Sequence, residues 1–317
     1  MSFRKSTAIL ASVVGGTLVV IVLFLTLYAW PAIRLNGIRF LGQNSWNLGS
    51  LYGNPITVRG QQILPGAHYG ILFLIVGTLL STAIALAIAV PVGVGAAMFL
   101  AEGVPSPLRP WMSFFVELLA AIPSVVYGLW GYVVVIPFLG HHLFPAMVRW
   151  LGFIPFLGGP AGSGYGLLTA GLVLTLMIVP LVTTTLRDAL VSPQASSLRE
   201  AAMALGASRF ETLRAVLLPS VRRVLIGGSI LATGRALGET MAVLMVSGNA
   251  LNYLPGNIYT PISTMASFIV SQLDSALEDP TGMAVRSLAE VALVLCLISV
   301  VVNSFARFLL YYDASRA

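Results

Sequence analysis

Long apolar stretches with few charged side chains dominate this chain of 317 residues. Hydrophobic residues make up 57% of the sequence and charged residues only 9%, whereas soluble globular chains carry about a quarter charged residues. An apolar helix of about 20 residues is long enough to cross the hydrocarbon core of a bilayer. The stretches therefore predict an all-α polytopic membrane protein. They exclude a soluble enzyme, a DNA-binding domain and a disordered scaffold.

Six transmembrane helices are predicted from these stretches. They cover about residues 7–30, 70–100, 111–139, 165–186, 224–246 and 287–310. The first exceeds the apolar region of a usual signal peptide and no A-x-A cleavage site follows it, so we expect an uncleaved helix. The chain then divides into an N-terminal transmembrane helix (1–30), an outer loop (31–69), a transmembrane core (70–311) and a C-terminal tail (312–317). A second outer loop is expected to hold His141, His142 and Trp150.

The basic residues set the orientation, because loops on the cytoplasmic side carry an excess of Lys and Arg. An inside N-terminus gives eleven inside residues: Arg4, Lys5, Arg109, Arg187, Arg199, Arg209, Arg214, Arg222, Arg223, Arg307 and Arg316. It leaves five outside: Arg34, Arg39, Arg59, Arg149 and Arg286. We therefore expect both termini in the cytoplasm. The net charge of +6 follows from this bias and does not indicate nucleic-acid binding.

The chain lacks the residues for ATP hydrolysis. A Walker A loop needs a lysine after its glycines to reach the nucleotide phosphates, and the sole lysine is Lys5. Three histidines and one cysteine, Cys296, do not favour a structural zinc site, and no nucleophile–base–acid set is found. We therefore expect no metal, no cofactor bound by this chain and no enzyme activity of its own.

A polar stretch at 187–223 is predicted to form a cytoplasmic helix–turn–helix. Ser-x-x-Glu capping boxes begin at Ser197 and Ser208, and each can satisfy the free N–H groups at a helix start. Gly206 is expected to end the first helix and Pro219 the second. Small and apolar residues share one face, which suits either close approach of another protein or contact with lipid headgroups. The residues alone leave both interpretations open.

Two charged residues lie inside the fifth predicted span. Burying Arg235 or Glu239 costs about 2.5–3.5 kcal/mol on insertion scales, so such residues usually have a partner or a function. At i and i+4 they are expected to share one helical face and to pair. They form either a substrate pathway that meets an anion or a structural ion pair that fixes helix packing.

The loop also carries a specific motif. Its residues are Glu200, Ala201, Ala202, Gly206, Val216, Leu218 and Pro219. Their types and spacing resemble the EAA motif of ABC-importer permeases, with valine in place of the usual isoleucine at position 216. The resemblance implies a type I ABC importer permease with a MetI-like core. It also implies that this loop docks on a separate ATPase subunit, which uses the ATP.

Further segments resemble the permeases of the phosphate-specific (Pst) importer, and specifically the C-type subunit. They lie at 99–102 (Phe-Leu-Ala-Glu), 116–131 and 234–243. The resemblance implies a bacterial inner membrane, a heterodimer with an A-type permease, an ATPase dimer, a periplasmic phosphate-binding protein and inorganic phosphate as substrate. It also associates Arg235 and Glu239 with phosphate passage. Permeases for sulfate or molybdate stay open as alternatives. An ATP-independent channel or secondary carrier is disfavoured because no inverted hydropathy repeat is visible.

Overall fold

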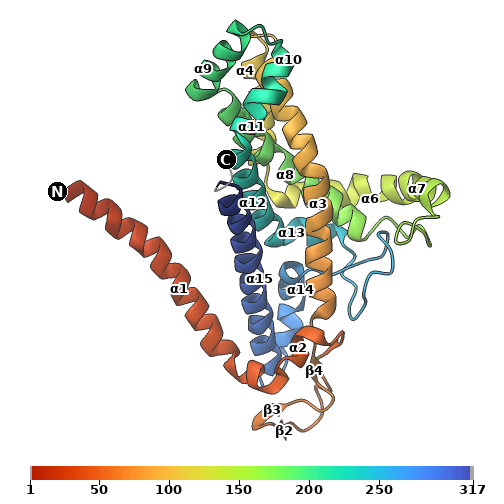
Figure 1. Cartoon of the computed structure of the whole chain (residues 1–317). Helices are drawn as coiled ribbons and strands as arrows, with labels where there is room; N and C mark the ends of the chain where they lie inside the picture. The colour runs from red at the N-terminus through yellow and green to blue at the C-terminus, as the bar shows by residue number, and fades with distance from the viewer. Residues whose placement is uncertain (1, 315–317) are drawn as a thin grey trace.

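The computed structural model describes residues 2–314 and shows an elongated bundle of helices (Figure 1). Its longest helices are α1 (Ser2–Asn36), α3 (Leu72–Met98), α8 (Leu167–Leu190), α12 (Arg222–Leu237) and α15 (Met283–Ala314). Helix α1 contacts α15 toward the C-terminal end of α1 and leans away from the bundle toward its N-terminus (Figure 1). The segment with α9 (Pro193–Ala204) and α10 (Arg209–Glu211) lies at the opposite end of the bundle from residues 39–69 (Figure 1). Arg316, assigned to the inside set, lies outside the described residues.

The six-span prediction agrees with the described helices. Five stretches are long and apolar enough to cross a membrane: Gly15–Asn36, Leu72–Gly103, Ser124–Leu151, Leu167–Leu190 and Met283–Phe308. A sixth is formed if Arg209–Ser220 and Arg222–Leu237, which meet at a 64° bend, count as one span. The first stretch ends six residues later than expected because the helix continues to Asn36 through Pro31.

The predicted third span, 111–139, is wrong in its boundaries. Helix α4 (Arg109–Ala121) stops before Pro123, and Ile122 is extended, the conformation favoured for a residue that precedes proline. A near-continuous helical run then follows. Its parts are α5 (Ser124–Trp130), η2 (Gly131–Val135), α6 (Ile136–Phe138), η3 (Leu139–Leu143) and α7 (Phe144–Leu151), where η marks a short π-helix. His141, His142 and Trp150 therefore lie in helix and not in an outer loop.

The predicted fifth span, 224–246, is also broken. Helix α12 ends at Leu237, and α13 (Met241–Val246) begins after a three-residue break. A non-helical segment then leads to α14 (Met265–Leu277), which the hydropathy pattern did not predict. Polar residues lower the hydropathy of α14, so the sequence pattern did not reveal it. Two of them stabilise its start, because the hydroxyls of Thr264 and Ser267 form a reciprocal capping box.

The segment between α1 and α3 contains a short helix, one β-hairpin and a second pair of strands that encloses the hairpin in the sequence. They are α2 (Arg39–Gly42), β1 (Trp46–Asn47) paired antiparallel with β4 (His68–Tyr69), and β2 (Ile56–Val58) paired antiparallel with β3 (Gln61–Ile63). The ring of Trp46 packs edge-on against both Tyr69 and Phe268. The segment therefore shares its core with the start of α3, with α14 and with the first half of α15.

Small residues let α3 approach its neighbours closely. Ala85 and Ala89 of α3 are fully buried in the main core cluster. A Cβ on Gly93 would lie 2.8 Å from Val182 of α8, and one on Gly77 would overlap the backbone oxygen of Ser263. Close approach through small residues is the usual basis of helix packing in membranes, where lipid is as apolar as a side chain.

This packing predicts that Gly77→Ala destabilises the protein. The added methyl meets backbone, which yields less than a side chain, so we expect a loss of about 1–3 kcal/mol. The measurement is the thermal unfolding midpoint of the detergent-solubilised protein. Gly95→Ala is the control, because it lies on the same helix and an added methyl there would meet nothing within 4 Å. An equal change in both variants would contradict the packing described.

Candidate functional site

Arg235 and Glu239 flank the break in the fifth span. Arg235 lies in the last turn of α12, which ends at Leu237, and Glu239 lies in the break itself. The Glu239 Oε1 accepts the backbone N–H of Ala242 at 3.4 Å, so the carboxylate helps to start α13. No ion pair joins Arg235 to Glu239 in the described part of the chain. The expected i, i+4 pair is wrong because the helix stops between the two residues.

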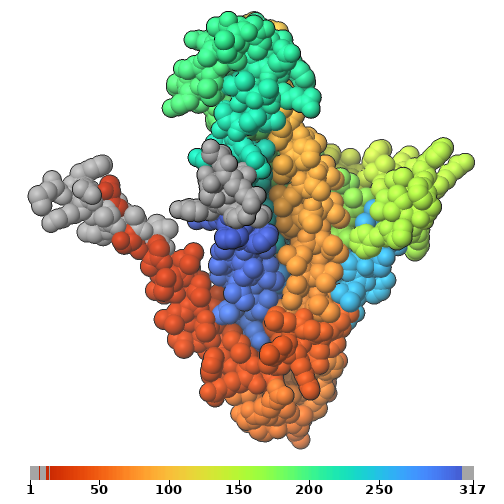
Figure 2. Space-filling model, in the orientation of Figure 1, coloured from red at the N-terminus to blue at the C-terminus, as the bar shows by residue number. Residues whose placement is uncertain are grey.

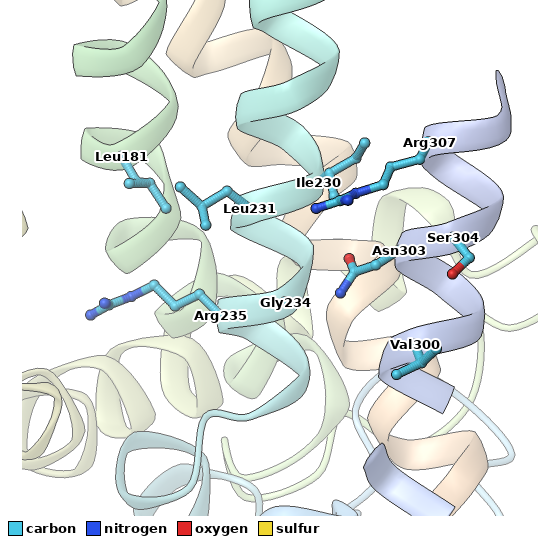
Figure 3. A pocket seen from close by; sticks show the side chains of 9 residues that line it. All are labelled: Leu181, Ile230, Leu231, Gly234, Arg235, Val300, Asn303, Ser304 and Arg307. Atoms are coloured by element: carbon cyan, nitrogen blue, oxygen red, sulfur yellow. The ribbon is translucent and has the colours of Figure 1, made fainter. Parts of the chain in front are cut away.

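A cavity of about 620 Å³ opens beside Arg235, between α12 and α15. Its lining comprises Leu181, Ile230, Leu231, Gly234, Arg235, Val300, Asn303, Ser304 and Arg307. Figure 3 shows Asn303 and Arg307 reaching from α15 toward α12, whereas Arg235 leaves the other side of α12. The two arginines therefore face different surroundings, although they line one cavity.

The guanidinium of Arg235 has no acidic partner within the described residues. The residue is exposed on the surface of this chain. A charged side chain on a membrane-spanning bundle faces water, a partner or a ligand, because facing lipid is costly. Arg235 is thus available to a hydrated path or to an anion.

The first helix of the loop between α8 and α12 begins earlier than predicted. Helix α9 (Pro193–Ala204) is capped by Ser192, whose hydroxyl accepts the N–H of Ala195 at 3.4 Å. Proline at the first helical position, Pro193, favours this start. The expected capping box at Ser197 is therefore wrong: Ser197 lies inside the helix and donates to the Pro193 carbonyl at 3.2 Å.

The second helical segment of the loop begins where it was predicted to begin, at Ser208. The capping box of Ser208 and Glu211 is confirmed, and the Ser208 hydroxyl and then its backbone N–H hold the pKa of the Glu211 carboxyl below its ordinary value. The segment comprises α10 (Arg209–Glu211), η4 (Thr212–Leu217) and α11 (Leu218–Ser220). It continues one residue past Pro219 and bends into α12 at Val221. Gly206 forms the turn before it, with φ +91°, a conformation that favours glycine.

The motif residues divide into two groups. Glu200, Ala201 and Gly206 are exposed and Ala202 is half-buried, on a segment that protrudes from one end of the molecule (Figure 2). Leu205, beside them, is 90% exposed. The remaining residues lie where the loop joins α12: Val216 and Leu218, both half-buried, and Pro219, exposed. The first group is an uncovered, partly apolar surface, and the second connects it to the fifth span.

One contact at this end was missed from the sequence. Arg199 of α9 forms an ion pair at 2.5 Å with Glu102, in the π-helical segment η1 (Phe99–Gly103) that ends α3. Glu102 is the first acidic residue of the chain, and it lies at the end of a span without other charges. This position could have indicated that Glu102 has a charged partner. The pair links the loop to the second span.

A family model described as "Binding-protein-dependent transport system inner membrane component" matches residues 89–313, which is more than two thirds of the chain. The chain belongs to this family. It is therefore a multi-pass permease subunit of an ABC transporter, and not itself an enzyme. The predicted fold class, an all-α polytopic permease, is confirmed, and the EAA motif is typical of the family.

Several relatives of this permease are similar over most of its length. A phosphate transport system permease protein, PstC 1 of Mycobacterium tuberculosis, is 48% identical over 283 residues, covering 88% of this chain and 83% of the relative. PstC of Pasteurella multocida is 37% identical, covering 97% and 90%. The predicted resemblance to C-type Pst permeases is confirmed. A solved structure of the inward-facing MetNI methionine ABC transporter is similar at 16% identity and a TM-score of 0.48, covering 75% and 96%.

Proposed function

We propose that this permease carries inorganic phosphate across the bacterial inner membrane as part of an ATP-driven importer. The names of its relatives support the substrate, since they are phosphate transport system permeases. The observation that carries the proposal is Arg235, an exposed guanidinium on a spanning helix without an acidic partner among the described residues. A guanidinium stays charged and can hold an oxyanion through two parallel hydrogen bonds.

The transport path is completed by other chains. A homologous A-type permease forms the second wall, a periplasmic phosphate-binding protein delivers the anion, and an ATPase dimer docks on the exposed group Glu200, Ala201, Ala202 and Gly206. ATP is used by the ATPase subunits, and this chain holds no cofactor. Movement of the loop reaches α12 through Val216, Leu218 and Pro219, so the segment that bears Arg235 moves with the ATPase.

Glu239 acts on the path by fixing its geometry. Its carboxylate accepts an N–H at the start of α13, which keeps the break after α12 open and the end of α12 in place. Broken helices at substrate sites are common in transporters, because unwound backbone is tolerated where it lines a cavity. Arg235 then offers positive charge at the end of α12 while Glu239 is held back from neutralising it.

The orientation is part of the proposal and has its own test. With both termini in the cytoplasm, a reporter fused after Ala317 reads as cytoplasmic in intact cells. The same reporter inserted at Gly60, in the outer hairpin, reads as external. Gly60 suits the insertion because nothing lies within 4 Å of its side-chain position. An external reading at the C-terminus contradicts the orientation.

The substrate is tested in cells that lack their own high-affinity phosphate uptake. Expression of this permease with its partner permease, ATPase and binding protein should restore uptake of labelled phosphate at low external concentration. Excess sulfate or molybdate should leave that uptake unchanged. Uptake that either competitor blocks would move the proposal to another oxyanion.

A further inference from the structure

A second charged pocket lies at the cytoplasmic end of the permease, away from Arg235. It has a volume of about 250 Å³ and sits between the inner end of α3 and the loop that bears the EAA motif. Its lining comprises Ala101, Glu102, Ser106, Arg109, Arg199, Met203, Arg209 and Thr212. The pocket therefore joins the second span, the start of α4 and both halves of the loop.

The charges of the residues that line this pocket do not balance. Arg109, Arg199 and Arg209 contribute three guanidinium groups, whereas Glu102 is the sole carboxylate in the lining. Glu102 is already paired with Arg199 at 2.5 Å. Two positive charges are left over at one small site. Positive charges gathered in this way attract an anion of matching size.

Several polar atoms of the pocket also lack hydrogen-bond partners. The hydroxyl of Thr212 is on a residue only 1% exposed and has no partner in the described part of the chain. The Nε atoms of Arg109 and Arg199 are buried and equally unsatisfied. An unsatisfied buried donor costs about 1–3 kcal/mol. The Oε1 of Glu102 is also buried without a hydrogen bond, but this single carboxylate is paired with Arg199 and cannot satisfy all three donors, so the pocket suits a further acceptor.

We propose that this pocket binds a free tetrahedral oxyanion from the cytoplasm, and that the oxyanion is inorganic phosphate. Guanidinium groups and a hydroxyl are the donors that suit such an anion. The identity of the ligand rests on the proposed function, because imported phosphate is released on this side of the membrane. Arg209, exposed at the rim on α10, provides the entry point.

The position of the pocket gives binding a consequence for transport. An anion held between Arg109 at the start of α4 and Thr212 in the loop ties the loop to the transmembrane core. A ligand stabilises whichever conformation binds it better. Phosphate at this site therefore favours the conformation with the loop packed on the core, and it slows transport as the internal concentration rises. The site is a product-feedback site.

The test uses the complete complex in proteoliposomes that contain ATP and a set concentration of unlabelled phosphate. The initial rate of labelled phosphate uptake is measured as internal phosphate increases. We expect inhibition of the wild type, and an inhibition constant weaker by about tenfold in Thr212→Val and in Arg209→Gln, which corresponds to about 1.4 kcal/mol. Arg214→Gln is the control, because it is an exposed arginine on the same segment that does not line the pocket.

The outcomes separate this site from the proposed function. Equal sensitivity of wild type and variants to internal phosphate overturns the feedback site, since inhibition then does not depend on this pocket. Loss of uptake by both variants without internal phosphate also overturns it, and it assigns the pocket to subunit docking. Absence of wild-type uptake without internal phosphate refutes the phosphate importer itself. Arg209→Gln keeps the test valid if Thr212→Val misfolds, because Arg209 is exposed and its replacement should not disturb the fold.

Discussion

Replacing Arg235 with alanine is expected to lower phosphate uptake by about two orders of magnitude. A hydrogen-bonded contact to a charged group contributes about 1.5–3 kcal/mol, and about 2.8 kcal/mol corresponds to a hundredfold change. Arg235→Lys keeps the charge but loses the planar fork, so we expect an intermediate loss of about tenfold. Uptake by the reconstituted complex is the measurement, after subunit assembly has been verified.

Arg307→Ala is the matched control for Arg235. Both arginines line the same cavity, but they approach it from different helices and Arg235 points away from it (Figure 3). We expect nearly normal uptake in Arg307→Ala, because the proposed anion contact involves the other side of α12. Full activity in Arg235→Ala would end the anion-contact interpretation. Equal losses in both variants would instead indicate that the cavity between α12 and α15 is the path.

The second large effect is expected at the loop between α8 and α12, where Glu200→Ala combined with Gly206→Trp should uncouple transport from ATP hydrolysis. Gly206 has φ +91°, so tryptophan strains the turn and also adds a bulky ring to the exposed surface. Phosphate uptake should fall more than about tenfold, since a strain of about 1–3 kcal/mol is added to the lost contact. ATP hydrolysis by the complex should no longer respond to the loaded binding protein.

Gln194→Ala serves as the control for the loop. Gln194 is exposed on the same helix, α9, but lies outside the motif and away from Gly206. It should leave both uptake and ATP hydrolysis near the wild-type values. Unchanged uptake in the double variant would count against docking of the ATPase on this surface. Loss in both the double variant and the control would show that α9 does not tolerate any change.

Periodicity and charge predicted the parts of the fold that depend on long uniform segments. The spans through α3, α8 and α15 were found because a bilayer requires about 20 apolar residues in sequence. The breaks were missed because they depend on single residues inside apolar runs. Pro123 ends α4, and α12 ends at Leu237 in a segment whose charges, Arg235 and Glu239, predicted a partner or a function but not the end of the helix.

The candidate site was predicted in its residues but not in its geometry. Arg235 stands out in any hydropathy pattern, because a charge in a span is rare. Its relation to Glu239 could not be predicted, since an i, i+4 pair requires an unbroken helix. The ion pair of Glu102 with Arg199 joins residues 97 positions apart in the sequence, and such a contact is fixed by tertiary packing alone.

The most direct test of the central proposal is uptake by proteoliposomes that contain this permease, its partner permease and the ATPase. ATP is enclosed, internal phosphate is omitted, and the binding protein and labelled phosphate are added outside. We predict phosphate uptake that requires ATP and that excess sulfate does not reduce. Uptake blocked by sulfate would contradict the substrate. Uptake without ATP, or none with all subunits assembled, would contradict an ATP-driven phosphate importer.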